Sequence, residues 1–175
     1  MAELKIVFTG CVSAGKTAAI TTISEIPIIT TDVKATDEVA SDKETTTIAM
    51  DYGEVTLEDG VVMKLYGTPG QERFQYMWEI LANGALGIII LVDNRRKDPI
   101  SDLALYLDNF KRFIDNSTVV IGVTHSDLAA RPGIELYHDY LMSREMCFPV
   151  FQIDARSRAD VVVLVESLVA MLEVA

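Results

Sequence analysis

The sequence has few cysteines, few histidines, a shortage of basic residues and no long hydrophobic run. Two cysteines, Cys11 and Cys147, are too few for a disulfide-stabilised secreted scaffold. Acidic residues outnumber basic ones by 26 to 15, and the resulting net charge of −11 disfavours nonspecific binding to nucleic acid or anionic lipid. The two histidines lack cysteines or acids at ligand spacing, so we expect no zinc site. The longest apolar run, Ala85–Val92, is too short to cross a bilayer.

The composition that remains is that of one globular domain. Half of the 175 residues are hydrophobic, and this length suits a single core, so we expect one domain over residues 1–175. Neither end carries a recognisable signal peptide or lipid-attachment motif. We therefore expect a cytoplasmic protein that has no direct membrane anchor and binds no nucleic acid.

A glycine-rich loop, Gly10–Thr17, follows a short apolar run and precedes a helix-forming segment. It fits the P-loop pattern G-x-x-x-x-G-K-[ST], and the strand–loop–helix context is the one in which that pattern binds nucleoside triphosphates. Backbone N–H groups and the helix N-terminus would face a phosphate, Lys16 would neutralise its terminal groups, and Thr17 would ligate Mg²⁺. A chance Gly-Lys pair is the alternative, which the context makes improbable. The expected phosphate-binding residues are Gly10, Ser13, Ala14, Gly15, Lys16, Thr17 and Ala18.

The hydrophobic pattern predicts an α/β fold of three layers, with a mostly parallel six-stranded sheet and one antiparallel edge strand. Ile28–Thr46 has little periodicity and is interpreted as a long exposed loop. The expected strands cover 4–9, 47–57, 61–66, 85–92, 118–123 and 148–153, and the expected helices cover 16–25, 71–83, 99–114, 133–143 and a last segment capped by Ser157 or Asp160. Functional residues in such sheets gather beyond the carboxyl ends of the strands.

Two further segments would contact the terminal phosphate. Thr47 could supply a hydroxyl to Mg²⁺ from a mobile segment, although a threonine run can simply start a strand. Thr68-Pro69-Gly70-Gln71 follows a strand, and there Gly70 would donate its N–H to the phosphate while Gln71 would orient the attacking water. The alternative, an ordinary strand-to-helix turn, explains the glycine but not the residues that follow it.

The base would be bound by two segments near the C-terminus. Asp127, in the segment that begins with Thr124 and His125, could accept from guanine N1 and its 2-amino group, which adenine cannot match. Without the other segments, a helix N-cap at Ser126 or Asp127 is nearly as good an interpretation. Ala155 and Arg156 could add backbone contacts to the base.

Together these residues resemble the small Ras-like GTPase superfamily over essentially the whole chain. Gly10–Thr17 is similar to its P-loop, Thr47–Tyr52 to the end of the first switch, and Thr68–Phe74 to the second switch; Thr124–Asp127 and Asp154–Arg156 lie where its base-reading motifs belong. The resemblance implies a GTP-binding molecular switch in signal transduction that uses Mg²⁺ and hydrolyses GTP to GDP. Lys16 and Gln71 would be its catalytic residues, Thr17 and Thr47 its metal ligands, and Thr47 and 68–71 its switch residues.

The departures from the superfamily pattern are specific. Gly67 stands where an aspartate normally begins the second switch motif, and Asp51 or Asp93 could replace that carboxylate. This feature resembles prokaryotic branches, the gliding-motility GTPase MglA and the conservon-associated ATP/GTP-binding proteins. Those families imply polarity or signalling switches that bind GTPase-activating or Roadblock/longin-type regulatory proteins and effectors.

The same departures predict slow intrinsic hydrolysis. Val12 could crowd Gln71, and no arginine lies between Ile28 and Thr47 to act in cis. Two alternatives stay open: a nucleotide-binding scaffold with little or no turnover, and an ATP-binding P-loop protein.

Overall fold

The computed structural model describes residues 4–35 and 46–174. Its strands form one seven-stranded sheet in the order β2-β3-β4-β1-β5-β6-β7. The strands are β1 (Leu4–Gly10), β2 (Ile29–Ala35), β3 (Thr46–Thr56), β4 (Val62–Gly67), β5 (Gly87–Asp93), β6 (Thr118–Thr124) and β7 (Val150–Gln152). All neighbouring strands pair in parallel except for β3, which is antiparallel to both β2 and β4.

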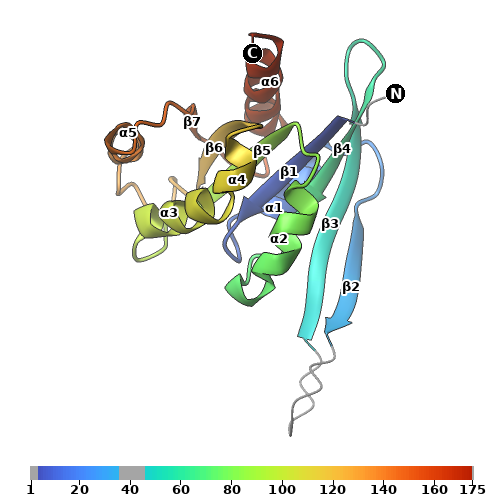
Figure 1. Ribbon diagram of the computed structural model, residues 1–175, viewed down its shortest axis with the longest axis horizontal. Helices are drawn as coiled ribbons and strands as arrows, with labels where there is room; N and C mark the ends of the chain where they lie inside the picture. Colours follow the sequence, from blue (N-terminus) through green and yellow to red (C-terminus); the bar gives the residue numbers. More distant parts are fainter. Residues whose placement is uncertain (1–3, 36–45, 175) are drawn as a thin grey trace, which may run out of the picture.

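Helices cover both faces of the sheet, as Figure 1 shows. They are α1 (Lys16–Ile23), a 3₁₀ turn η1 (Glu72–Phe74), α2 (Gln75–Ala82), α3 (Pro99–Asn109), α4 (Lys111–Ile114), α5 (Ile134–Ser143) and α6 (Arg158–Val174). The helices α1 and α6 pack against each other on one face, whereas α2 and α3 contact β1 on the other. The three-layer α/β class is therefore confirmed. Among the described helices, none is long and apolar enough to span a membrane.

The centre of the sheet is apolar because its strands are covered on both sides. Every residue of β5 is buried, and the same is true of nearly all of β6, which matches their continuous apolar sequence. On the α2–α3 face, the Trp78 ring stacks on Tyr106 at 4.7 Å and on Phe110 at 5.9 Å between ring centroids. This stack fixes α2 against α3 and so fixes the segment that connects β4 to α2.

Two fold predictions are wrong. The sheet has seven strands rather than six, because the first part of the predicted loop Ile28–Thr46 forms β2; the middle of that loop, 36–45, lies outside the described residues. The antiparallel strand is β3, which lies second from the edge, and the edge strand is β2. An edge strand is stabilised largely by main-chain hydrogen bonds to one neighbour, so its side chains need no apolar alternation and leave little signal in the sequence.

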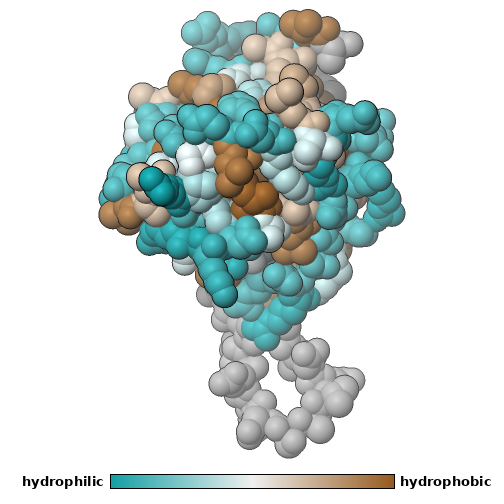
Figure 2. Space-filling view, turned by 90° about the vertical axis from the view of Figure 1, so that its left-hand side faces the viewer, coloured by the Kyte–Doolittle hydropathy of each residue, from teal (hydrophilic) through white to brown (hydrophobic). Residues whose placement is uncertain are grey.

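The remaining elements agree with the expected order, with shifted ends. The predicted helix over 71–83 is a 3₁₀ turn followed by α2, and the last strand is reduced to Val150–Gln152. Ser157 immediately precedes α6 and accepts from the N–H of Asp160 at 3.3 Å, so Ser157 is the capping residue. The face of the molecule in Figure 2 is largely hydrophilic, with hydrophobic areas of limited size surrounded by polar surface.

Candidate functional site

The loop between β1 and α1 has the backbone shape that its glycines predict. Gly10, Ser13 and Gly15 all have positive φ angles, of 143°, 67° and 100°. A Cβ atom on Gly10 would lie 2.2 Å from the carbonyl oxygen of Leu91, so only glycine fits there. The loop thus closes tightly over the ends of β1 and β5 and leads directly into the first turn of α1.

Lys16, the first residue of α1, bends back over this loop. Its buried Nζ donates to the carbonyl oxygens of Gly10 and Cys11, at 2.7 Å each. Burial lowers the pKa of Lys16 to about 8. An anionic group beside the ammonium would offset the free-energy cost of burying this charge. The loop therefore presents a buried cation that favours binding of an anion.

Gly70 brings the β4–α2 connection against the same loop. A Cβ atom on Gly70 would lie 2.6 Å from the backbone nitrogen of Val12 and 2.9 Å from Nζ of Lys16. The connection is anchored on both sides of Gly70. The buried Thr68 hydroxyl hydrogen-bonds to the Thr9 hydroxyl at 2.8 Å, and Pro69 accepts from Nε1 of Trp78 at 2.6 Å. Thus Gly70 meets the P-loop at the lysine, and the contacts of Thr68 and Pro69 hold the connection in this place.

Gln71, the predicted water-orienting residue, lies beside the loop but is exposed. Its Oε1 accepts from Nε of Arg73 at 2.7 Å. Arg73 also covers the ring of Phe74, with 4.9 Å from Cζ to the ring centroid. In this structure Gln71 is therefore held by a neighbour in its own turn.

Asp51 occupies the space opposite Gly67. The two residues face each other across the β3–β4 pair, and the Asp51 carboxylate is buried. Its Oδ2 accepts from the Thr17 hydroxyl at 2.5 Å and its Oδ1 accepts from Thr30 at 2.9 Å. A Cβ on Gly67 would lie 3.2 Å from Cβ of Asp51. Of the two carboxylates that could replace the missing one, Asp51 is therefore the one placed at Thr17.

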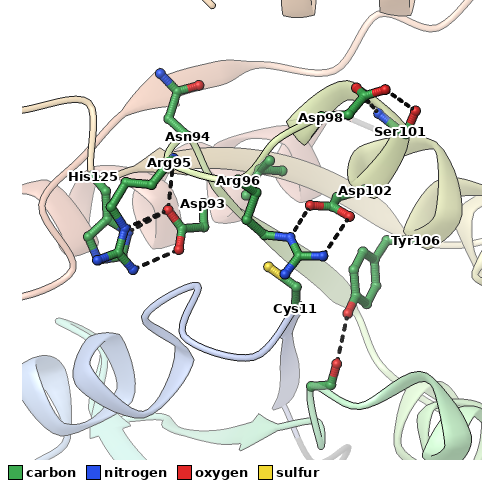
Figure 3. Close-up of polar contacts among 12 residues, drawn as sticks. Cys11, Asp93, Asn94, Arg95, Arg96, Asp98, Ser101, Asp102, Tyr106 and His125 are labelled. Atoms are coloured by element: carbon green, nitrogen blue, oxygen red, sulfur yellow. Dashed lines mark hydrogen bonds and ion pairs between the residues drawn. The ribbon is translucent and has the colours of Figure 1, made fainter. Parts of the chain in front are cut away.

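The second carboxylate candidate, Asp93, is engaged elsewhere. It ends β5, and the Arg95 side chain donates to both of its carboxylate oxygens, at 3.0 and 2.8 Å. Nδ1 of His125 lies 3.1 Å from the same carboxylate. Burial acts to raise the pKa of Asp93, but the hydrogen bonds from Arg95 outweigh it and the pKa is lowered. Asp93 is thus an ionised anchor for the loop after β5 (Figure 3).

Thr47, the other predicted metal ligand, lies within β3 and pairs with Lys34 of β2. It is four positions before Asp51, which corresponds to roughly 13 Å along a strand. Its role as a metal ligand stays a prediction. In this structure the Thr30 hydroxyl donates to Oδ1 of Asp51.

The side chains of Thr17 and Asp51 offer oxygen atoms that could ligate Mg²⁺. Hydroxyl and carboxylate oxygens are the donors that Mg²⁺ prefers, and phosphate oxygens normally complete its shell. Among the described residues there is no cluster of three or more His, Cys, Asp or Glu side chains that could hold a metal ion. The Thr17–Asp51 pair therefore fits a cation that arrives with a phosphate ligand.

Thr124 ties the predicted base-binding segment to the P-loop. Its buried hydroxyl lies 2.8 Å from the carbonyl oxygen of Ala14 and 3.2 Å from that of Val92. His125 follows with a positive φ of 60°. The helix-cap interpretation of Ser126 and Asp127 fails, because the next helix, α5, begins only at Ile134.

Asp127 and Arg156 face the same region from two loops. Asp127 is exposed, and its charge helps to raise the pKa of Arg156. Arg156 pairs mainly with Asp154 at 2.8 Å, which lowers the pKa of that carboxyl to about 2. Between them, Ala155 packs against the P-loop: a Cβ on Gly15 would lie 2.8 Å from the Ala155 Cβ. The structure thus places Thr124 and Ala155, two of the predicted base-binding residues, against Ala14 and Gly15 of the P-loop. Gly70 contacts the loop at Val12 and Lys16, and Asp51 contacts it at Thr17.

A P-loop at the carboxyl edge of a mostly parallel sheet, with these loops around it, defines a P-loop nucleotide-binding protein of the GTPase-like class. The chain belongs to the family described as "Conserved hypothetical ATP binding protein", whose model matches residues 27–173. The matched region begins after the P-loop, so the assignment of Gly10–Thr17 depends on the loop itself.

Relatives among known proteins agree with this class. The GTP-binding protein YPTM2 of Zea mays is 29% identical over 129 residues, which cover 71% of this chain and 64% of the relative. The GTP-binding protein YPTM1 of Zea mays is 27% identical over 129 residues, covering 71% and 62%. The uncharacterized protein MJ1339 of Methanocaldococcus jannaschii is 38% identical over 47 residues, covering 27% and 30%. The chain thus spans less than two thirds of the length of the maize relatives.

Sequence reasoning missed some of the residues around the P-loop. Thr30 was part of a segment interpreted as a loop, and its contact with Asp51 depends on the β2–β3 register. Arg96 and Asp102 form an ion pair beside Gln71, and no motif marks either residue. A charged loop directly after a buried strand was the available signal.

Proposed function

We propose that the chain is a GTP-binding molecular switch that needs Mg²⁺ and hydrolyses GTP to GDP slowly. The observation that carries this proposal is the contact of Gly70 with the P-loop at Lys16. A switch requires a segment that senses the outermost phosphate, and the β4–α2 connection ends where that phosphate would lie.

Each part of the site has a role in this proposal. Lys16 neutralises the phosphate oxygens, and the backbone N–H groups of the P-loop and of Gly70 donate to them. Thr17 and Asp51 hold the magnesium ion, whose chemistry is to neutralise charge on the phosphates. Gln71 orients the attacking water once it has left Arg73.

The base preference depends on Asp127. A carboxylate accepts two hydrogen bonds from guanine N1 and its 2-amino group, whereas the corresponding edge of adenine does not offer this pair of donors. The names of the maize relatives support GTP, and the family description favours the second candidate, an ATP-binding P-loop protein. The names of the relatives thus point to GTP and the family description points to ATP. Measured affinities for the two nucleotides distinguish these candidates.

Titration of the protein with GTP, GDP and ATP in the presence of Mg²⁺ tests the proposal. We expect GTP and GDP to bind far more tightly than ATP. Asp127→Ala should weaken GTP without weakening ATP, whereas the control Asp139→Ala, at an exposed position of α5, should change neither. Equal affinity of the wild type for GTP and ATP would defeat the guanine preference, and tighter binding of ATP would favour the ATP-binding candidate.

Turnover separates the switch from a scaffold that only holds nucleotide. The hydrogen bond that engages Gln71 with Arg73 favours slow hydrolysis. From the resemblance to MglA-like proteins, we propose that a regulatory protein of the GTPase-activating or Roadblock/longin type accelerates it, in signalling or polarity in the cytoplasm. Gln71→Ala should lower the accelerated rate, and an unchanged rate would support the scaffold.

A further inference from the structure

A cavity of about 300 Å³ lies beside the P-loop, on the side of α3. Val12, Gly70 and Gln71 line it from the nucleotide side. Arg96, Asp102 and Tyr106 line it from the loop after β5 and from α3. The cavity therefore places Gln71, the predicted water-orienting residue, near Arg96 and Asp102, which have no role in the function proposed above.

Arg96 and Asp102 form an ion pair in this cavity (Figure 3). Nε of Arg96 contacts one oxygen of Asp102, and Nη2 lies 3.3 Å from the other. The Arg96 side chain is 47% exposed, and that of Asp102 is 17% exposed. An ion pair this open to water contributes little free energy, so it can open when a stronger anion arrives.

The guanidinium of Arg96 lies next to the P-loop. Figure 3 shows it between Asp102 and the side chain of Cys11. Burial raises the pKa of the Cys11 thiol, so the group beside Arg96 is neutral and Asp102 is the anion that holds the arginine. The nearest stronger anion would be a triphosphate on the loop that contains Cys11.

The other arginines around the site are held more firmly or lie outside this cavity. Arg95 makes a bidentate pair with the buried Asp93, which also accepts from the Arg95 backbone N–H at 3.0 Å. Arg73 contacts Gln71 and the Phe74 ring. Of the described residues that line the cavity, Arg96 is the sole arginine.

We propose that Arg96 is a catalytic arginine supplied in cis for GTP hydrolysis, and that Asp102 holds it away from the phosphate until nucleotide binds. This inference rests on the proposed function. In the reaction a water oxygen forms a bond to the γ-phosphorus, and the bond from that phosphorus to the β,γ-bridging oxygen breaks. The electron pair stays on the bridging oxygen of GDP, and both protons of the water leave with inorganic phosphate, as H2PO4⁻. Arg96 stabilises the charge that develops on the transferring group.

The test compares three variants of the full chain. Each is first titrated with a fluorescent GTP analogue, and its hydrolysis of GTP is then followed in a single turnover. Arg96→Ala removes the cation and Asp102→Asn releases it. Asp108→Asn is the control, because Asp108 is also on α3 and pairs with Arg144 at 2.5 Å, outside the cavity.

We expect Arg96→Ala to lower the single-turnover rate at least about tenfold, less than the ~10³–10⁵-fold of a fully engaged arginine, while GTP affinity changes by less than about threefold. Asp102→Asn should raise the rate, and the combined variant should match Arg96→Ala. Asp108→Asn should match the wild type. A wild-type rate for Arg96→Ala, or a proportional loss of GTP affinity, would overturn the inference.

A second measurement tests the inference if the basal rate of hydrolysis is too slow to measure. GDP with aluminium fluoride imitates the transferring phosphate, so the wild type and Asp102→Asn should bind this complex and Arg96→Ala should not. Equal binding by Arg96→Ala would overturn the role of Arg96 alone. Failure of the wild type to bind any guanine nucleotide would overturn the proposed function, and this inference with it.

Discussion

Asp51 of β3 faces Gly67 of β4 across an antiparallel pair, and its carboxylate accepts the Thr17 hydroxyl at 2.5 Å. The carboxylate therefore reaches the end of the P-loop from the neighbouring strand. A side chain at position 67 would crowd this arrangement, because its Cβ would lie 3.0 Å from Cδ1 of Ile20 and 3.3 Å from Oδ2 of Asp51. We therefore expect this place to accept one carboxylate, supplied by either strand.

The first prediction is that Asp51→Ala weakens magnesium-dependent retention of GDP by about 10- to 100-fold, the range seen when a carboxylate that supports a metal site is removed. Adding Gly67→Asp to this variant should recover most of the loss, since the new carboxylate would enter the emptied space. The measurement is the Mg²⁺ concentration that retains labelled GDP. Glu58→Ala, an exposed change in the β3–β4 turn, is the control. If the double variant does not recover retention of GDP, a carboxylate at position 67 cannot replace that of Asp51, and this prediction is wrong.

The second prediction concerns Thr124, whose buried hydroxyl joins the end of β6 to the P-loop. Thr124→Val keeps the volume but leaves the carbonyl oxygens of Ala14 and Val92 without this donor. We expect the free energy of unfolding to fall by about 1–3 kcal/mol, measured by urea denaturation. Thr118→Val, at the other end of the same strand, should cost much less.

The sequence was enough to predict the P-loop, the central strands and the loops that begin at Thr124 and Asp154, whose role in base binding stays a prediction. Those features depend on local signals: glycines at fixed spacing, continuous apolar strands, and polar residues where strands end. The choice between Asp51 and Asp93 could not be made, because it depends on the register between β3 and β4. The edge strand β2 was missed because main-chain pairing stabilises it.

The ion pair of Arg96 and Asp102 could not be predicted from the sequence for a related reason. The two residues lie on either side of the turn that begins α3, where Asp98 caps the helix by accepting from the N–H of Ser101 at 3.0 Å. The cap directs the chain from β5 into α3 so that both side chains enter one cavity. Sequence spacing alone does not show into which cavity two charges point.

The third prediction is a pH dependence caused by Lys16, whose pKa in the free protein is about 8. The β-phosphate of a bound nucleotide raises this pKa again, so below pH 8 the lysine is charged in both states and its contribution to affinity is complete. Above pH 8 the free protein must take up a proton to bind, and the affinity should fall by up to about tenfold per pH unit. Titrations of GDP between pH 7 and pH 9 measure this slope. Lys16→Met should bind weakly and without that slope, and an equal slope in the variant would assign the proton to another group.

The last prediction uses Trp78, the single tryptophan of the chain, which donates to Pro69 beside Gly70. If Gly70 moves to meet the terminal phosphate, the environment of this indole must change, so GTP and GDP should give different Trp78 emission. Gly70→Ala should remove most of this difference and weaken GTP more than GDP, because the added Cβ would lie 2.6 Å from the backbone nitrogen of Val12. Gly60→Ala, in the open β3–β4 turn where an added Cβ meets nothing within 4 Å, is the control for the loss of a glycine away from the site; its φ of 82° makes alanine strained there, so it also controls for lost stability. Identical emission with the two nucleotides in the wild type would mean that the β4–α2 connection does not sense the phosphate, even if both nucleotides bind.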